Sequence, residues 1–146
     1  MTRPSLLLLD TNILIHLVRK NQVGHSIESQ FRIRMRRERP LISIVTVGEA
    51  LAMAKRCGWG PAKTTALADL LQSLVTIEIS DDILEIYAQF DFFLRRSGKA
   101  VEQNDIWIAA TTAATGAHLL TTDKDFDPLY PAYLDRTWID PQRPDA

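Results

Sequence analysis

The stretch Leu6-Leu7-Leu8-Leu9-Asp10-Thr11-Asn12 is the part of the sequence from which the fold can be worked out. Four consecutive leucines predict a short buried strand, and the polar residues behind them end it abruptly. Apolar segments at 41–44, 75–79 and 118–122 are also predicted to be strands, and the last of these again stops at an aspartate, Asp123. The chain therefore contains short strands that lead directly into polar turns.

Helical stretches separate these strands. Apolar spacing and helix-ending residues predict helices over 13–20, 26–39, 47–57, 61–74, about 81–96 and 105–115, with a last edge strand at 137–139. Ser26 and Ser80 are candidate caps. Strands that alternate with helices indicate one α/β domain with a mostly parallel central sheet flanked by helices. We expect this domain to occupy residues 1–140, with 141–146 as a frayed polar tail.

The composition is that of an ordinary globular domain. The chain has 146 residues, is 46% hydrophobic and 24% charged, and carries a formal net charge of -1, which argues against intrinsic disorder. The single cysteine, Cys57, excludes an internal disulfide framework and a zinc site built from cysteines. No apolar run approaches the roughly 20 residues of a membrane span, and the N-terminus lacks a secretory signal. We therefore expect a cytoplasmic protein without a membrane contact.

The charge is unevenly distributed along the chain. Residues 1–73 carry 11 Lys and Arg against 5 Asp and Glu, whereas residues 74–146 carry 6 against 13. This asymmetry is compatible with a basic surface for a polyanion and an acidic cluster elsewhere. Composition alone favours the simpler alternative of scattered solvated charge.

Four carboxylates from separate segments lie at or near predicted strand ends. Asp10 and Asp123 follow strands directly, Glu49 lies one helical turn beyond the second strand, and Asp105 opens an apolar helix. In open α/β sheets, ligands bind in the crevice beyond the carboxyl ends of the strands. We therefore expect these four side chains to meet at one edge of the sheet.

Each of these carboxylates also has a purely structural interpretation. Asp10 could cap the first helix, and Thr46-Val47-Gly48-Glu49 fits a capping box. Asn104 could be a cap with Asp105 complementing the helix dipole, and Asp123 could be a turn residue. Taken singly, these explanations are preferable. Taken together, they do not explain why four elements place an acid at the same edge.

A cluster of carboxylates needs a compensating cation. Two unit charges about 4 Å apart repel by roughly 4 kcal/mol at an effective dielectric of 20. Mg²⁺ or Mn²⁺ offsets this repulsion and prefers such oxygen ligands. A bound ion of this kind lowers the pKa of water and stabilises charge in phosphoryl transfer. Because the sequence has no Gly-rich phosphate loop and no Ser/His/Asp pattern, it favours a metal-dependent phosphodiesterase.

At these residues the sequence resembles the PIN-domain ribonucleases, and in particular the VapC-like toxins of type II toxin–antitoxin modules. The resemblance runs from about Ser5 to Ile139. Four fragments carry it, in order and at matching separations: Leu8-Leu9-Asp10-Thr11-Asn12-Ile13-Leu14-Ile15, Ser43-Ile44-Val45-Thr46-Val47-Gly48-Glu49, Asn104-Asp105-Ile106-Trp107-Ile108-Ala109-Ala110 and Leu120-Thr121-Thr122-Asp123-Lys124-Asp125-Phe126. Each fragment is weak by itself, and the four together are a strong signal.

The resemblance implies a PIN fold and Mg²⁺- or Mn²⁺-dependent endonucleolytic cleavage of RNA. By position, the catalytic acids would be Asp10, Glu49, Asp105 and Asp123. All but Glu49 would ligate the metal, and Glu49 would ligate it or orient the attacking water. The residues expected to support these acids are Thr11, Asn12, Thr46, Asn104, Thr122 and Asp125. Family membership also implies a cognate antitoxin and, often, a homodimer.

An arginine-rich segment is the candidate RNA-binding surface. Residues 31–39 contain one acid, Glu38, and five arginines: Arg32, Arg34, Arg36, Arg37 and Arg39. Phosphate contacts dominate affinity for nucleic acids, and arginine is well suited to make them. A solvated helix face with arginine stems over apolar surface is an equal alternative.

Other functions remain open beside a toxin that cuts RNA. The chain could be a non-catalytic PIN-fold module that sequesters RNA or a protein partner, or a PIN nuclease outside toxin–antitoxin systems. It could also be a phosphohydrolase with an acidic pocket for a small molecule. Turnover of RNA in the presence of a divalent metal separates a nuclease from the binding module and from the phosphohydrolase.

Overall fold

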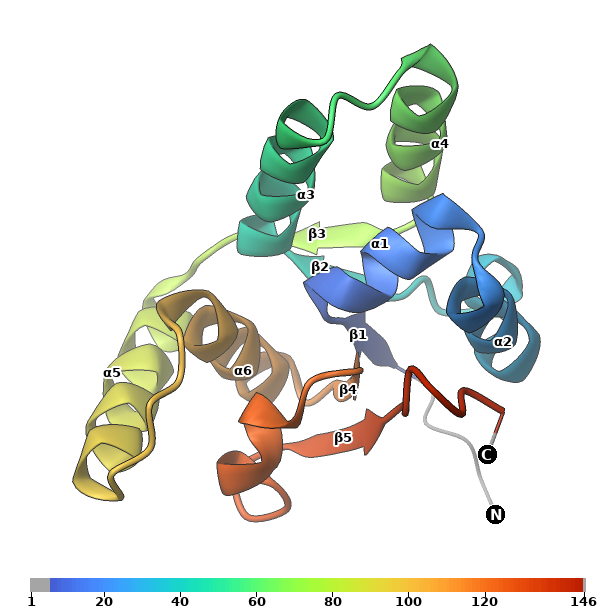
Figure 1. The fold of residues 1–146 in the computed structure, drawn as a ribbon. Coiled ribbons are helices and arrows are strands. Elements are labelled where there is room, and N and C mark those ends of the chain that lie inside the picture. The colour runs from blue at the N-terminus through green and yellow to red at the C-terminus, as the bar shows by residue number, and fades with distance from the viewer. Residues whose placement is uncertain (1–5, 146) are drawn as a thin grey trace.

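The computed structural model describes residues 6–145, in which helices and strands alternate (Figure 1). The elements in chain order are β1 (Leu7–Leu9), α1 (Thr11–Arg19), α2 (Gln22–Phe31), the 3-10 helix η1 (Ile33–Met35), β2 (Leu41–Ser43), α3 (Ile44–Arg56), α4 (Pro61–Gln72), β3 (Val75–Ile77), α5 (Asp81–Arg96), α6 (Gln103–Thr115), β4 (His118–Thr121), the 3-10 helix η2 (Lys124–Leu129) and β5 (Asp135–Trp138). No helix in this part of the chain is long and apolar enough to cross a bilayer.

Five strands form one parallel sheet with β1 at its centre. The strand order is β3-β2-β1-β4-β5, and every neighbouring pair is parallel. The expected α/β architecture is therefore confirmed, with β5 at one edge of the sheet and β3 at the other. The sheet is strongly twisted, so that the arrows of β3 and β5 point in different directions in Figure 1. Because all strands run the same way, their carboxyl ends share one edge.

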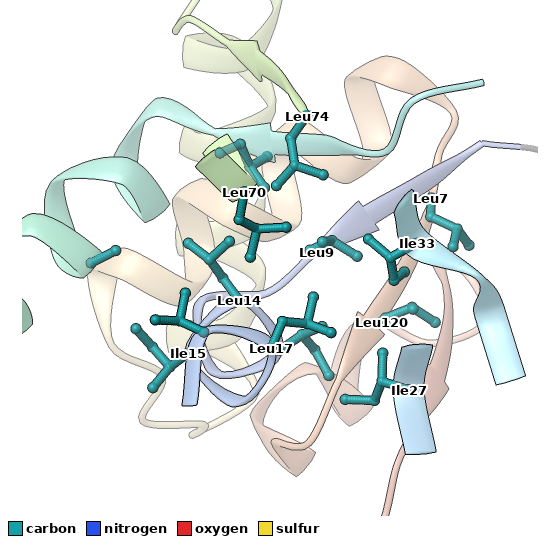
Figure 2. Close-up of a cluster of buried hydrophobic side chains, with 14 of the residues drawn as sticks. Leu7, Leu9, Leu14, Ile15, Leu17, Ile27, Ile33, Leu70, Leu74 and Leu120 are labelled. Atoms are coloured by element: carbon teal, nitrogen blue, oxygen red, sulfur yellow. The ribbon is translucent and has the colours of Figure 1, made fainter. Parts of the chain in front are cut away.

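The leucines of β1 pack into the cores on both faces of the sheet. Successive side chains of a strand point to opposite faces, so Leu7 and Leu9 belong to one core and Leu8 to the other. Helices α1, α2 and α4 contribute to the first core, which contains Leu14 and Leu70 (Figure 2). Helices α5 and α6 contribute to the second. Each of the three β1 leucines is 0% exposed, and full burial of such a side chain contributes about 1.5–3 kcal/mol.

The second helix differs from the prediction of a helix over 26–39. It begins after Asn21, whose side chain accepts a hydrogen bond from the backbone N–H of Gly24 (2.9 Å). It ends before Arg32, which has a left-handed backbone (φ 50). Ser26, expected as a cap, is a buried residue inside the helix. The arginine segment is therefore a 3-10 turn and a loop instead of a helix face.

The third helix begins directly after β2 instead of at residue 47. Ser43 caps it, because the serine hydroxyl accepts a hydrogen bond from the backbone N–H of Val45 (3.1 Å). Thr46 and Glu49 therefore lie inside the helix, and their interpretation as a capping box is wrong.

The C-terminal tail, expected to fray, packs against α2. Pro144 is buried, and its carbonyl oxygen accepts hydrogen bonds from Ser26 Oγ (3.1 Å) and Gln30 Nε2 (2.7 Å). The Asp145 carboxylate also accepts a hydrogen bond from the Ser26 hydroxyl. The tail up to residue 145 is thus attached to a helix of the domain.

Candidate functional site

Asp10 lies at the junction of β1 and α1, at the carboxyl edge of the sheet. Its Oδ1 accepts a hydrogen bond from the backbone N–H of Thr11 (2.8 Å), and its Oδ2 accepts one from Thr121 Oγ (2.7 Å). The side chain is almost fully buried, with 2% of the residue exposed. Asp10 therefore caps α1, and its second oxygen is directed to the end of β4.

The Thr121 hydroxyl joins two of the acidic residues. It donates to Asp10 and accepts a hydrogen bond from the backbone N–H of Asp123 (2.9 Å). The supporting threonine expected from the sequence was Thr122, but successive residues of a strand face opposite ways. The structure assigns the contact to Thr121, whereas the backbone carbonyl of Thr122 accepts a hydrogen bond from Trp138 Nε1 (3.0 Å).

Glu49 is held from two sides. Its Oε1 accepts a hydrogen bond from Thr11 Oγ (2.7 Å), and its Oε2 accepts one from Asn104 Nδ2 (2.9 Å). The hydroxyls of Thr46 and Thr11 lie 3.1 Å apart. These contacts connect α1, α3 and α6 around one carboxylate. Asn104 is not the cap of α6, because Glu102 occupies that position.

Asp105, Asp123 and Asp125 form a close group of carboxylates. One oxygen from each lies within 4.8 Å of the others. Asp105 is in the first turn of α6, and Asp123 caps η2 by accepting a hydrogen bond from the backbone N–H of Asp125 (2.9 Å). Asp125, expected only as a supporting residue, is therefore a full member of this group.

Burial and mutual repulsion raise the pKa values of these carboxyls. Burial is the largest cause for Asp10, whose pKa rises to about 6 although two hydrogen bonds oppose the shift. The pKa of Asp105 rises to about 8, through burial first and then through four neighbouring carboxylates. Burial and the charge of Asp123 also raise the pKa of Asp125. Within residues 6–145, no Lys or Arg forms an ion pair with any of these four acids.

Three of the carboxylates, Asp10, Glu49 and Asp105, line a cavity between α1, α3 and α6. This cavity has a volume of about 510 Å³. Asn12 also lines it, Met53 gives the wall of α3 an apolar part, and Arg56 lines it from the last turn of α3. A larger cavity, of about 670 Å³, lies on α5 and is lined by no carboxylate. The convergence of acids, and not cavity size, therefore identifies the candidate site.

The arginine segment lies at the opposite edge of the sheet. Residues 32–39 lead into the first residue of β2, and Arg39 Nη1 donates to the backbone carbonyl of Gln72 (3.3 Å), shortly before β3 begins. Arg36 Nη1 donates to a backbone carbonyl of α2 (2.9 Å), and Arg34 pairs with an acid of the same helix (3.8 Å). The segment is therefore placed at the amino ends of the strands, away from the carboxylates, and its contact with RNA stays a prediction.

This combination of fold and site defines a class of α/β domain with an acidic centre at the carboxyl edge of its sheet. The family model of the PIN domain matches residues 7–130. The chain therefore belongs to the PIN domain family, as the four sequence fragments indicated.

Two curated proteins from Mycobacterium tuberculosis are similar in sequence. Ribonuclease VapC5 is 26% identical over 130 residues, which cover 88% of this chain and 90% of that protein. Ribonuclease VapC4 is 34% identical over 88 residues, which cover 58% of this chain and 67% of that protein.

Solved structures support the same fold. VapBC2 from Rickettsia felis, bound to a DNA fragment from its promoter, has a TM-score of 0.76 at 19% identity and covers 90% of this chain and 97% of its own. The toxin–antitoxin family member VapBC-5 from Mycobacterium tuberculosis has a TM-score of 0.68 at 24% identity, with 93% and 100% covered.

Proposed function

We propose that the protein is a metal-dependent endoribonuclease that hydrolyses phosphodiester bonds, and that it is the toxin of a toxin–antitoxin pair. The observation that carries the proposal is the convergence of Asp10, Glu49, Asp105 and Asp123 at one edge of a PIN-domain sheet. The curated relatives are named ribonucleases, which supports RNA as the substrate. An RNA substrate also supports a cytoplasmic location.

The donor set suits Mg²⁺ or Mn²⁺. The close group offers three carboxylate oxygens within 4.8 Å of one another, and both ions prefer oxygen ligands. The raised pKa of Asp105 reflects its burial and the negative charge of its neighbours, which a cation would offset. Asp105 and Asp123 would hold the ion, with Asp10 or Asp125 as a further ligand. When bound, the ion supplies an acidified water and compensates the charge of the phosphate.

Glu49 is the candidate for orienting the attacking water. Each of its oxygens already accepts one hydrogen bond, from Thr11 and from Asn104, so the carboxylate has a fixed orientation and still has lone pairs available. A carboxylate fixed in this way can accept a hydrogen bond from water and take up its proton. Asp10 is fixed in the same manner by Thr121 and by the start of α1.

Cleavage assays with defined variants test the nuclease. Wild-type protein is expected to cut RNA with Mn²⁺ or Mg²⁺ and to stop when EDTA is added. Glu49→Gln and Asp123→Asn should each lower the rate by at least about 100-fold. Asp69→Asn changes an exposed carboxylate on α4 and should retain the wild-type rate.

Three results would contradict the nuclease. These are cleavage that persists in EDTA, full activity of both site variants, and tight RNA binding with no turnover in Mn²⁺. The last of these would identify a binding module. Circular dichroism of each variant checks that the fold is retained.

Growth assays test the toxin assignment. The structural neighbours include VapBC complexes, so we expect a small neighbouring gene to encode an antitoxin. The wild-type chain should inhibit growth, co-expression of that gene product should restore it, and Asp123→Asn should not inhibit. Active cleavage without any effect on growth would place the protein among PIN nucleases outside toxin–antitoxin systems.

A further inference from the structure

The cavity beside the carboxylates continues along one face of α3 to the last turn of this helix. Glu49, Met53 and Arg56 all line it. Residues three, four or seven apart lie on the same face of a helix, and seven residues correspond to about 10 Å along the helix axis. The cavity therefore has an acidic end at Glu49 and a cationic end at Arg56.

Arg56 is suited to hold a phosphate at the cationic end. Among the described residues that line the cavity, it is the only Lys or Arg. Its side chain is exposed and, within residues 6–145, forms no ion pair with Glu49 or any other acid. A guanidinium binds phosphate oxygens through two parallel hydrogen bonds. Because the two helix positions lie about 10 Å apart, Arg56 and the carboxylates serve different phosphates.

The part of the cavity between these two ends is uncharged and open. Gly48 and Ala52 lie one turn apart on α3 and line it together with Met53. A Cβ at Gly48 would meet nothing within 4 Å, so the space beside this turn is free. The flexible, polarizable side chain of methionine packs well against aromatic rings. This part of the cavity therefore suits the flat ring of a base.

Asn12 is the polar group beside this open space. It is exposed in the first turn of α1 and lines the cavity. Thr11 and Asn104 bind Glu49, whereas the Asn12 amide makes no hydrogen bond within the part of the chain that the structure describes. The expectation that Asn12 supports the acids therefore has no contact behind it. An amide offers a donor and an acceptor side by side, which matches the edge of a base.

We propose that this cavity binds one nucleotide next to the scissile bond and reads its base. Arg56 binds the phosphate on the side of this nucleotide away from the cleavage, and Asn12 binds the edge of the base. The inference rests on the proposed nuclease and adds a position at which the RNA sequence is read. Phosphate contacts carry no sequence information, whereas contacts to base edges do. Arg56 therefore contributes affinity, and Asn12 contributes specificity.

Neutral linkages in the substrate test the phosphate contact. Each RNA of a series of short oligonucleotides carries one methylphosphonate linkage, and a 2′-O-methyl group protects that linkage from self-cleavage. The matched substrate has the same 2′-O-methyl group and an ordinary phosphate. At one linkage beside the scissile bond, the neutral group should raise KM for the wild type at least about tenfold. The same change should have no further effect on Arg56→Ala, which has already lost the contact.

Two further variants separate the contact from the general charge of α3. Arg56→Lys should recover part of the affinity and part of the sensitivity to the neutral linkage, because it keeps the charge. Lys55→Ala is the matched control, since Lys55 is an exposed cation of the same turn that does not line the cavity. It should respond to each neutral linkage as the wild type does.

Base substitutions test the role of Asn12. Four short RNAs differ only in the base of the nucleotide next to the scissile bond. For the wild type, kcat/KM should differ between the best and the worst base by at least about tenfold, and Asn12→Ala should reduce this ratio to about threefold or less. Gly48→Leu fills the space for the base and should raise KM for all four RNAs, while the increase in Tm that Mn²⁺ gives should remain.

The possible failures distinguish this inference from the proposed nuclease. A wild-type chain that cleaves none of the RNAs in Mn²⁺ would overturn both. An active wild type that tolerates every neutral linkage as well as Arg56→Ala does would overturn the phosphate contact alone. A rate that Asn12→Ala lowers equally for all four bases would show that Asn12 supports the acids and does not read the base. Circular dichroism checks that each variant is folded.

Discussion

At the residue scale, the Thr121 hydroxyl is the group that positions two acids relative to each other. It donates to the Asp10 carboxylate and accepts from the backbone of Asp123. We expect Thr121→Val to lower kcat/KM by about 10–100-fold, as loss of a group that orients metal ligands does. Thr121→Ser should recover most of the activity, because it keeps the hydroxyl.

Thr122→Val is the matched control, because the side chain next along the strand should not affect cleavage. Loss of activity in Thr122→Val together with full activity in Thr121→Val would contradict this assignment. The sequence could not distinguish the two threonines, because a strand of four residues is too short to show which of its alternating side chains face the site. The closeness of Asp125 to Asp105 could not be predicted for a related reason, because it depends on how η2 begins.

The raised pKa values of Asp10 and Asp105 predict how the stability of the metal-free protein depends on pH. The ordinary pKa of an aspartate carboxyl is 3.8, and in the folded protein the values rise to about 6 for Asp10 and about 8 for Asp105. Between about pH 4 and 8 the folded state therefore binds more protons than the unfolded state, and the free energy of unfolding falls as the pH rises. In EDTA, Tm should be higher at pH 5 than at pH 8.

Asp105→Asn should remove part of this dependence. At pH 8 without metal, the Tm of this variant should exceed that of the wild type by about 2–4 °C for each kcal/mol gained in the free energy of unfolding. Solvent screening reduces this gain, because the Asp105 carboxyl is only partly buried. The increase in Tm that Mn²⁺ gives the wild type should be lost. Asp69→Asn should change neither property. A Tm of metal-free wild type that is constant from pH 5 to pH 8 would refute the electrostatic account.

At the scale of elements, the contact between α1 and α2 depends on Gly24. A Cβ at this position would lie 2.2 Å from the backbone oxygen of His16, in the neighbouring helix. We expect Gly24→Ala to reduce the free energy of unfolding by about 1–3 kcal/mol, the usual cost of overpacking. Gly48→Ala is the control, because a Cβ there meets nothing within 4 Å and alanine should stabilise α3 by roughly 1 kcal/mol.

Urea unfolding measures both changes. A Gly24→Ala variant as stable as the wild type would mean that α2 can shift away from α1 without loss. The misprediction of α2 has another cause, which is that Asn21 caps the helix and Ser26 does not. Serine is a residue type that often caps helices, but in the structure the Ser26 hydroxyl donates a hydrogen bond to the backbone carbonyl of Pro144, far along the chain. By contrast, α5 was predicted correctly because Ser80 and Gly98 mark its ends locally.

At the scale of the whole molecule, the sequence predicted the parallel sheet and the edge at which the acids meet. Because the arginine segment directly precedes β2 of a parallel sheet, its place at the amino edge follows from the same prediction, whereas its 3-10 turn and loop in place of a helix do not. Since the arginine segment lies at the amino edge, we expect its contribution to RNA binding to depend on the length of the RNA. Arg37→Ala should leave cleavage of a short oligonucleotide unchanged and weaken binding of long RNA, with a salt slope smaller by about 0.7.

Arg56→Ala is the contrasting variant, because Arg56 lines the acidic cavity. It should raise KM for short and long RNA alike. Impaired cleavage of the short oligonucleotide by Arg37→Ala would show that the substrate crosses the sheet from one edge to the other.

The order of strands in the sheet also determines when the acidic centre can assemble. β4 lies between β1 and β5, although it is synthesised late. It contains Thr121 and is followed by Asp123. Domains fold as units as they emerge from the ribosome. A nascent chain that has emerged only as far as α5 has Asp10 and Glu49 but neither of those later residues. Truncated translation products of this gene should therefore be harmless to the transcripts around them.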